Sequence, residues 1–231
     1  METIKFNNQE ILVNPRSEVE VSVLREIFKI REYRAAEAAI KSAQDPILDV
    51  GAHVGFFTLY CRALNARVPV VALEPEDHNL ASLRAHLKAN QTTKVTVVVG
   101  GLTAQTGKRN LQLSADSHNH RILPLGKIAA ANEAVQLVPV FSLADLCQSR
   151  KIKHLSLLKM DIEGGEYELL EAWSERDFSL FKCLLMEYHN KYLNNRAKLE
   201  KILREQGFGV QIFPSKFDKT MGIIMATNKR V

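Results

Sequence analysis

The chain has 231 residues, a formal net charge of +5, and ordinary apolar and charged fractions of 46% and 25%. This length allows one large domain, and the apolar content is enough for a sizeable core. No apolar stretch has the length of a membrane-spanning helix, and the first residues do not resemble a secretory signal. Three widely spaced cysteines fit no Cys-x-x-Cys pattern, so we expect buried, reduced thiols in a cytoplasmic protein without membrane association. Lys and Arg are scattered along the chain, which does not favour a specific nucleic-acid partner.

Residues 1–45 are predicted to form a small N-terminal cap, and residues 46–231 the main part of a single domain. The cap begins with alternating residues that indicate a hairpin, whose turn lies at Asn7-Asn8. From Ser17 onwards, apolar residues recur at helical spacing. We expect these elements to cover one edge of a sheet, mainly as packing, and lining the entrance to a ligand site is the alternative.

The next segment predicts a strand, a glycine turn and a helix. Residues 47–50 are mostly apolar, Gly51 and Gly55 bracket a turn, and helical spacing follows. This geometry lets backbone N–H groups approach a ligand closely. An acid at Asp49 would repel a pyrophosphate but can accept hydrogen bonds from an ammonium group, which favours S-adenosylmethionine over a dinucleotide. The candidate cofactor contacts in this segment are Asp49, Gly51, Ala52, His53 and Gly55.

Two further apolar strands are predicted to complete the cofactor site. The first ends at Glu74, at an offset from the glycine turn where an acid receives ribose hydroxyls in nucleotide-binding folds. Pro75 follows it directly. The second strand ends at Gly101, and Leu102 follows at its carboxyl end, where an adenine ring is expected to be held by apolar contact and a polar group.

The pattern changes in residues 108–139, which we interpret as an insertion. Two segments alternate like exposed strands, and a polar stretch between them contains His118 and His120. Histidines in such a loop are usually solvated, although a lid over a site is an alternative.

Ionisable groups end two more predicted strands, which is the pattern of an active site at one edge of a parallel sheet. Asp161 and Glu163 follow one strand, and Glu187 and His189 end the next. The two acids share one side only if strand geometry continues through residue 162. One of the four groups is expected to act as a general base while the others orient an acceptor, and Asp161 also lies close to the expected cofactor. Binding of a divalent metal is an alternative that we do not expect, and a structural role in helix caps or ion pairs is another.

The alternation of elements predicts an α/β fold with a seven-stranded, mostly parallel sheet and helices on both faces. The last two strands have no helix between them, so an antiparallel pairing is expected there.

Four segments resemble, in order, the motifs of the FkbM-type S-adenosylmethionine-dependent methyltransferases: ILDVGAHVGFFTL, ALEP, VPVFSLADL and LKMDIEGGE. The resemblance covers about residues 19–228, and the motif that contains Asp161 and Glu163 is the most specific. It implies a class I methyltransferase fold (a Rossmann-like architecture), S-adenosylmethionine as cofactor, and methyl transfer to a hydroxyl oxygen of a small molecule or glycan. The chain departs from the family pattern at His53, where Asn is usual, and at Gly100-Gly101, where Ala precedes the Leu.

Two other functions stay open at this point. The positive charge permits a nucleic-acid or protein methyltransferase, but the chain has neither an Asn-Pro-Pro-Tyr motif nor a Pro-Cys pair. A non-catalytic nucleotide-binding module is the other alternative, and the intact set of Asp49, Gly51, Gly55 and Glu74 disfavours it. The sequence makes no prediction about oligomeric state or the identity of the acceptor.

Overall fold

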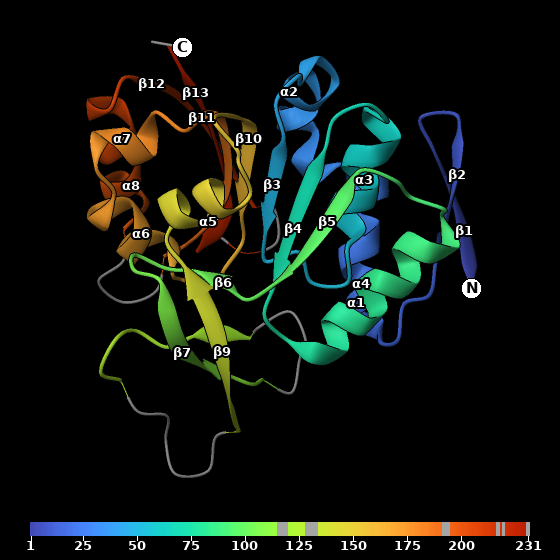
Figure 1. Ribbon diagram of the computed structural model, residues 1–231. Helices are drawn as coiled ribbons and strands as arrows, with labels where there is room; N and C mark the ends of the chain where they lie inside the picture. The colour runs from blue at the N-terminus through green and yellow to red at the C-terminus, as the bar shows by residue number, and fades with distance from the viewer. Residues whose placement is uncertain (115–119, 128–133, 191–194, 216–217, 219, 230–231) are drawn as a thin grey trace.

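The computed structural model describes residues 1–114, 120–127, 134–190, 195–215, 218 and 220–229. Its centre is a seven-stranded sheet with the order β12-β13-β11-β10-β3-β4-β5 (Figure 1). The strands are β3 (Ile47–Val50), β4 (Val70–Glu74), β5 (Val95–Val99), β10 (Leu155–Met160), β11 (Phe181–His189), β12 (Phe208–Pro214) and β13 (Met221–Asn228). Neighbours pair in parallel except at β13, which is antiparallel to both β11 and β12. The predicted sheet and its antiparallel final strand are confirmed.

Four helices cover one face of the sheet. They are α5 (Leu143–Ser149), α6 (Glu166–Ala172), α7 (Glu175–Phe178) and α8 (Arg196–Glu205). Successive side chains of a strand point to opposite faces, so Leu48, Val50 and Leu158 face these helices and form one core with them.

The other face packs against α3 (Phe56–Leu64) and the N-terminal helical segments. These segments are α1 (Glu18–Arg25), the π-helix η1 (Glu26–Ile30), the 3₁₀-helix η2 (Glu32–Ala36) and α2 (Glu37–Ser42). Leu24, Ile27 and Ile40 are buried in one cluster with Ile47 and Leu157 of the sheet. The N-terminal helices therefore cover a face, and the predicted edge position is wrong, because their apolar stripe needs the broad apolar surface of the central strands.

The N-terminal hairpin forms as predicted from β1 (Glu2–Phe6) and β2 (Gln9–Val13). Asn7 and Asn8 have φ of 50° and 60°, the left-handed values that a tight two-residue hairpin turn requires. The hairpin lies against α4 (Asp77–Ala89): the Asn14 N–H donates to His86 Nε2 at 2.9 Å.

The insertion forms a second, four-stranded sheet with the order β6-β9-β7-β8, which lies below the main sheet in Figure 1. Its strands are β6 (Gly101–Leu102), β7 (Gly107–Gln112), β8 (Arg121–Ile122) and β9 (Val135–Phe141). Because β6 directly follows β5, the insertion lies at the carboxyl end of the main sheet. His120 belongs to the described residues, whereas His118 lies outside them.

Two expectations from composition concern membrane spans and cysteines. Within the described ranges, no helix has the length and apolar character needed to cross a bilayer. Cys61, Cys147 and Cys183 are all buried and form no disulfide, as expected for packed thiols.

Candidate functional site

Two adjoining cavities lie at the carboxyl ends of the parallel strands. The first lies between the ends of β3 and β4, the loop after β10, and the insertion. The second lies between the ends of β10 and β11 and the N-terminal helices. Both are partly open to solvent. Three residues line both cavities: Gly51, His53 and Asp161.

The glycine turn after β3 forms as predicted, although the need for Gly51 has a different cause. Gly51 has φ of +71°, and a Cβ there would lie 2.0 Å from the carbonyl oxygen of Asp161. The backbone of the loop after β10 thus excludes a side chain, independently of any ligand. Gly55, with φ of +89°, precedes α3, and a Cβ at this position would lie 3.2 Å from Cγ of Leu83. It lies outside the residues that line either cavity.

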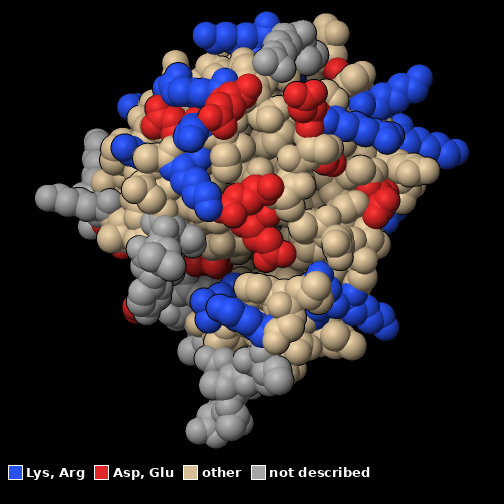
Figure 2. All heavy atoms as spheres, turned by 90° about the vertical axis from the view of Figure 1, so that its left-hand side faces the viewer, with Lys and Arg blue, Asp and Glu red and all other residues tan. Residues whose placement is uncertain are grey.

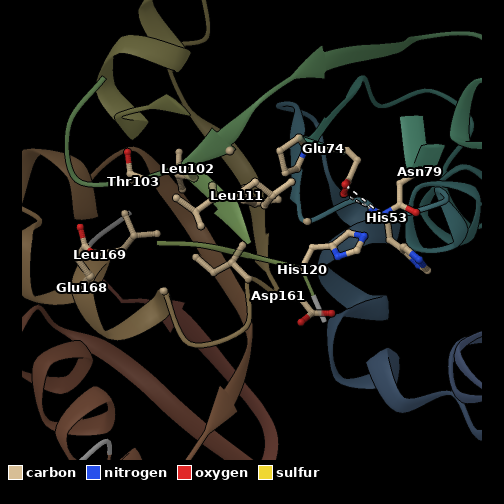
Figure 3. Close-up of a pocket in the computed structure, with 17 residues that line it drawn as sticks. His53, Glu74, Asn79, Leu102, Thr103, Leu111, His120, Asp161, Glu168 and Leu169 are labelled. Atoms are coloured by element: carbon tan, nitrogen blue, oxygen red, sulfur yellow. Dashed lines mark hydrogen bonds between the residues drawn. The ribbon is translucent and has the colours of Figure 1, made fainter. Parts of the chain in front are cut away.

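Glu74 is held at the end of β4 and lines the first cavity (Figure 3). One carboxylate oxygen accepts the His53 N–H at 2.8 Å, and the other accepts the Glu76 N–H at 3.1 Å and Asn79 Nδ2–H at 3.3 Å. Burial nevertheless raises the pKa of Glu74 to about 7. The carboxyl group is therefore fixed in position while its charge depends on pH near neutrality.

The remaining wall of the first cavity combines predicted and unpredicted residues. Pro75, Gly101 and Leu102, which are predicted to contact the cofactor, line it. The insertion adds His120, which the sequence analysis named only as solvated or part of a lid, and two residues that sequence reasoning missed, Leu111 and Ile122. The insertion also explains Gly101, because a Cβ there would lie 2.0 Å from Cδ1 of Ile122. The only sequence signal for these contacts was His120 itself, in a loop that was interpreted as solvated or as a lid.

Asp49 is not in contact with either cavity. It is completely buried, accepts a hydrogen bond from Thr58 Oγ1 at 2.7 Å, and lies 3.4 Å from Lys159 Nζ. Lys159 also donates to the carbonyl oxygen of Gly51 at 2.8 Å. The structure thus places Asp49 behind the glycine turn, and the predicted direct approach to an ammonium group is not what this geometry provides.

Strand alternation brings the ionisable residues of β10 and β11 to the same face of the sheet. The two strands pair directly, with Lys159 opposite both Asp49 and Leu185. Lys159, Asp161, Glu187 and His189 all line the second cavity. Sequence reasoning required this direct pairing for the groups to converge, and it is confirmed.

The buried Lys159 and the half-buried Asp161 form an ion pair, with Nζ and Oδ2 separated by 3.8 Å. Burial alone would lower the pKa of Lys159, but Asp49 and Asp161 raise it overall. Burial would raise the pKa of Asp161, but the charges of Lys159 and His189 and a hydrogen bond with Glu187 lower it overall. For Glu187, burial and the charge of Asp161 raise the pKa well above its usual range. Asp161 is therefore ionised, and Glu187 is its protonated neighbour.

Glu163 reaches the second cavity by a route that the sequence did not predict. β10 ends at Met160, and Glu163 has a positive φ of 55°, so the strand geometry does not continue through residue 162. The turn, rather than strand alternation, directs Glu163 towards His189, with Oε2 and Nε2 3.7 Å apart. On the other side of the ring, His189 Nδ1 lies 3.8 Å from Oε1 of Glu166. The sequence analysis did not single out Glu166 as a site residue.

The N-terminal helices supply the opposite wall of the second cavity, in addition to the packing that was predicted for them. Glu26, Glu32 and Tyr33 line this wall. Burial, with the nearby charges of Glu26 and Asp161, raises the pKa of Glu32 to about 7. Glu26 belongs to the π-helix η1, an irregular helix type that is frequent at functional sites. Over the described part of the chain, no group of three or more His, Cys, Asp or Glu side chains is arranged to hold a metal ion.

This arrangement can be compared with known proteins. The family described as the methyltransferase FkbM domain matches residues 49–210. The chain belongs to this family. It is 26% identical to Methyltransferase 1 of Beauveria bassiana, over 87% of this chain and 86% of that protein. It is 23% identical to 31-O-demethyl-FK506 methyltransferase FkbM of Streptomyces tacrolimicus, over 91% of this chain and 90% of that protein.

The solved structures show the fold of this FkbM-family protein. Magnesium protoporphyrin IX methyltransferase from Synechocystis, with S-adenosylmethionine bound, superimposes with a TM-score of 0.53 at 13% identity, over 94% of this chain and 86% of that one. The predicted class I methyltransferase fold is confirmed. The protein is an S-adenosylmethionine-dependent methyltransferase, and the predicted cofactor is likewise confirmed.

Proposed function

We propose that this enzyme transfers the methyl group of S-adenosylmethionine to a hydroxyl oxygen of a small molecule or a sugar-containing metabolite. The observation that carries the proposal is the junction of the two cavities at Gly51, His53 and Asp161. A cofactor in the first cavity and an acceptor in the second would meet there. The Streptomyces relative, named as a 31-O-demethyl-FK506 methyltransferase, supports a hydroxyl acceptor on a small molecule.

The first cavity fits S-adenosylmethionine. Glu74 offers carboxylate oxygens at the position where ribose hydroxyls are received, and Pro75 and Leu102 offer apolar surface to an adenine ring. Leu111 and Ile122 of the insertion extend this apolar surface.

The second cavity supplies groups that can position and deprotonate a hydroxyl. S-adenosylmethionine brings an electrophilic methyl group when it is bound. As the oxygen–carbon bond forms and the carbon–sulfur bond breaks, the hydroxyl proton needs an acceptor. We assign His189 as this base. Asp161, which is ionised and lines both cavities, accepts a hydrogen bond from the acceptor and orients it.

The test is methyl transfer from S-adenosylmethionine labelled at its methyl group to a panel of hydroxylated metabolites and sugars, with total RNA and a protein extract as further acceptors. We expect a labelled methyl ether on a hydroxylated small molecule. Label found only on nucleic acid, protein, nitrogen or carboxylate groups would contradict the proposal.

On the face shown in Figure 2, Lys and Arg are interspersed with Asp, Glu and neutral residues, which is the pattern of an ordinary solvated surface.

The cofactor affinity is expected to depend on Glu74 and on pH. Ribose hydroxyls favour the ionised carboxylate, so protonation of Glu74 as pH falls below about 7 weakens binding. We expect S-adenosylmethionine to bind up to about tenfold more weakly at pH 6 than at pH 8. Glu74→Gln should lose about 1.5–3 kcal/mol of binding free energy at pH 8 and most of this pH dependence.

Isothermal titration calorimetry at both pH values measures these affinities. The matched control is Glu10→Gln, on the exposed hairpin, which should bind like the unaltered protein. Equal affinity for Glu74→Gln and the control at pH 8 would remove Glu74 from the cofactor site.

A further inference from the structure

Glu166 is a buried acid, and its structural role explains its burial only in part. It is the first residue of α6 and is completely buried. Its Oε1 accepts the Ile162 N–H at 3.1 Å and so holds the loop after β10. Its Oε2 is buried and meets no hydrogen-bond partner among the residues that the structure describes. Burial of an unused acceptor is costly, which indicates a further role for this carboxyl group.

The geometry connects Glu166 with His189. His189 lines the second cavity, whereas Glu166 lies behind it and lines neither cavity. Their closest atoms, Nδ1 and Oε1, are 3.8 Å apart, and Glu163 Oε2 lies 3.7 Å from Nε2 on the cavity side. Such distances are longer than hydrogen bonds, but catalytic contacts in unliganded enzymes often tighten when substrate binds.

We propose that Glu166 is a positioning residue that sets the protonation of His189 for the methyl transfer proposed above, on which this role rests. The two groups hold one extra proton in common. When that proton leaves, the Glu166 carboxylate accepts a hydrogen bond from Nδ1–H, and Nε2 faces the acceptor cavity without a hydrogen. Nε2 then takes the hydroxyl proton, and Glu166 balances the charge of the imidazolium.

The electrostatics of the pair give its pH dependence. Burial raises the pKa of Glu166 to about 8, and the charges of Asp161 and Glu163 act in the same direction. The extra proton is therefore retained at neutral pH and leaves as pH rises through about 8. The other titratable groups that line the same cavity are Lys159, Asp161, Glu163 and Glu187 from β10, its loop and β11, and His53, Glu26, Glu32, Tyr33 and Asp218 from the facing walls.

Nuclear magnetic resonance of protein labelled with ¹⁵N-histidine tests this assignment without any acceptor. A His189→Gln variant identifies the two ring nitrogens of His189. In the unaltered protein we expect Nε2 to lose its hydrogen when Glu166 ionises near pH 8, and Nδ1 to carry the ring hydrogen above this pH. In Glu166→Gln this transition should be lost, because no carboxyl group ionises at position 166. Glu171→Gln, at an exposed position of the same helix, should leave it unchanged.

Kinetics with an identified acceptor provide the second measurement. Glu166→Gln keeps an oxygen for the Ile162 N–H, so we expect normal thermal stability but a kcat about tenfold to a hundredfold lower. KM for the acceptor should change little.

Loss of hydrogen from Nδ1 instead of Nε2 in the unaltered protein, or an unmoved transition in Glu166→Gln, overturns the proposal. If Glu166→Gln fails to fold, the unaltered protein alone still decides which nitrogen keeps its hydrogen. If the protein shows the expected change at His189 Nε2 but methylates no hydroxyl group, the proposed function is wrong, and the pairing of Glu166 with His189 still stands.

Discussion

Lys159→Met is expected to lower the free energy of unfolding by about 3–5 kcal/mol, because it leaves the buried carboxylate of Asp49 without its counter-charge. Lys159 is only 3% exposed, and its ammonium group lies 3.4 Å from Asp49 and 3.8 Å from Asp161. Its hydrogen bond to the Gly51 carbonyl also joins the end of β10 to the glycine turn. Loss of this one side chain therefore disturbs the junction between the two cavities. Urea unfolding at pH 7 measures the effect.

Two further variants separate charge from packing in this experiment. Combining Asp49→Asn with Lys159→Met should recover part of the lost stability, since it removes one unbalanced charge. Lys182→Met, at an exposed position of the adjacent strand β11, should change stability by no more than about 0.5 kcal/mol. Equal, small effects for the variants at 159 and 182 would show that the buried ion pair is not needed for stability.

His189→Ala and Asp161→Asn are each expected to lower the methyl-transfer rate by on the order of a hundredfold, which corresponds to about 2.7 kcal/mol. The first removes the proposed base. The second keeps the shape of the side chain but removes the charge that faces Lys159 and that we propose orients the acceptor. The affinity for S-adenosylmethionine should change little, because the first cavity supplies most of the proposed cofactor contacts.

Single-turnover kinetics and calorimetry on the same preparations separate these two effects. Glu171→Gln on the surface of α6 is the control and should keep the full rate. If both variants methylate a genuine acceptor at the rate of the control, the cluster is structural and catalysis rests on positioning alone. If they lose cofactor affinity together with rate, the second cavity cannot be assigned to the acceptor only.

The elements themselves could be predicted because each carries a local signal. β3, β4 and β10 are buried on both faces, so each appears in the sequence as a short apolar run. The glycine turn, the hairpin turn at Asn7-Asn8 and the N-cap at Ser142 also follow from single-residue backbone and side-chain preferences. In a parallel sheet, groups that follow such strands meet at one edge, which explains why Asp161, Glu187 and His189 could be singled out.

Other features depended on contacts between segments far apart in the chain. The turn at Glu163 replaced the expected strand geometry, and Asp49 proved to be directed towards Lys159, about 110 residues later, rather than towards a ligand. The contribution of His120 to the first cavity and of Glu32 to the second arose because the insertion and the N-terminal helices pack over the ends of the strands. No local pattern marks such contacts.

The sequence by itself determined the sheet, the glycine turn, the family likeness and the choice of cofactor, because apolar periodicity, backbone preferences and short motifs act over a few neighbouring residues. The tertiary structure alone decided which ionisable side chains share a cavity, which of them keep their charge, and which segments close the walls. Those properties depend on strand register and on burial, since the loss of water is what raises the pKa of Glu74, Glu166 and Glu187. A carboxyl group acquires such an environment only when distant parts of the chain pack around it.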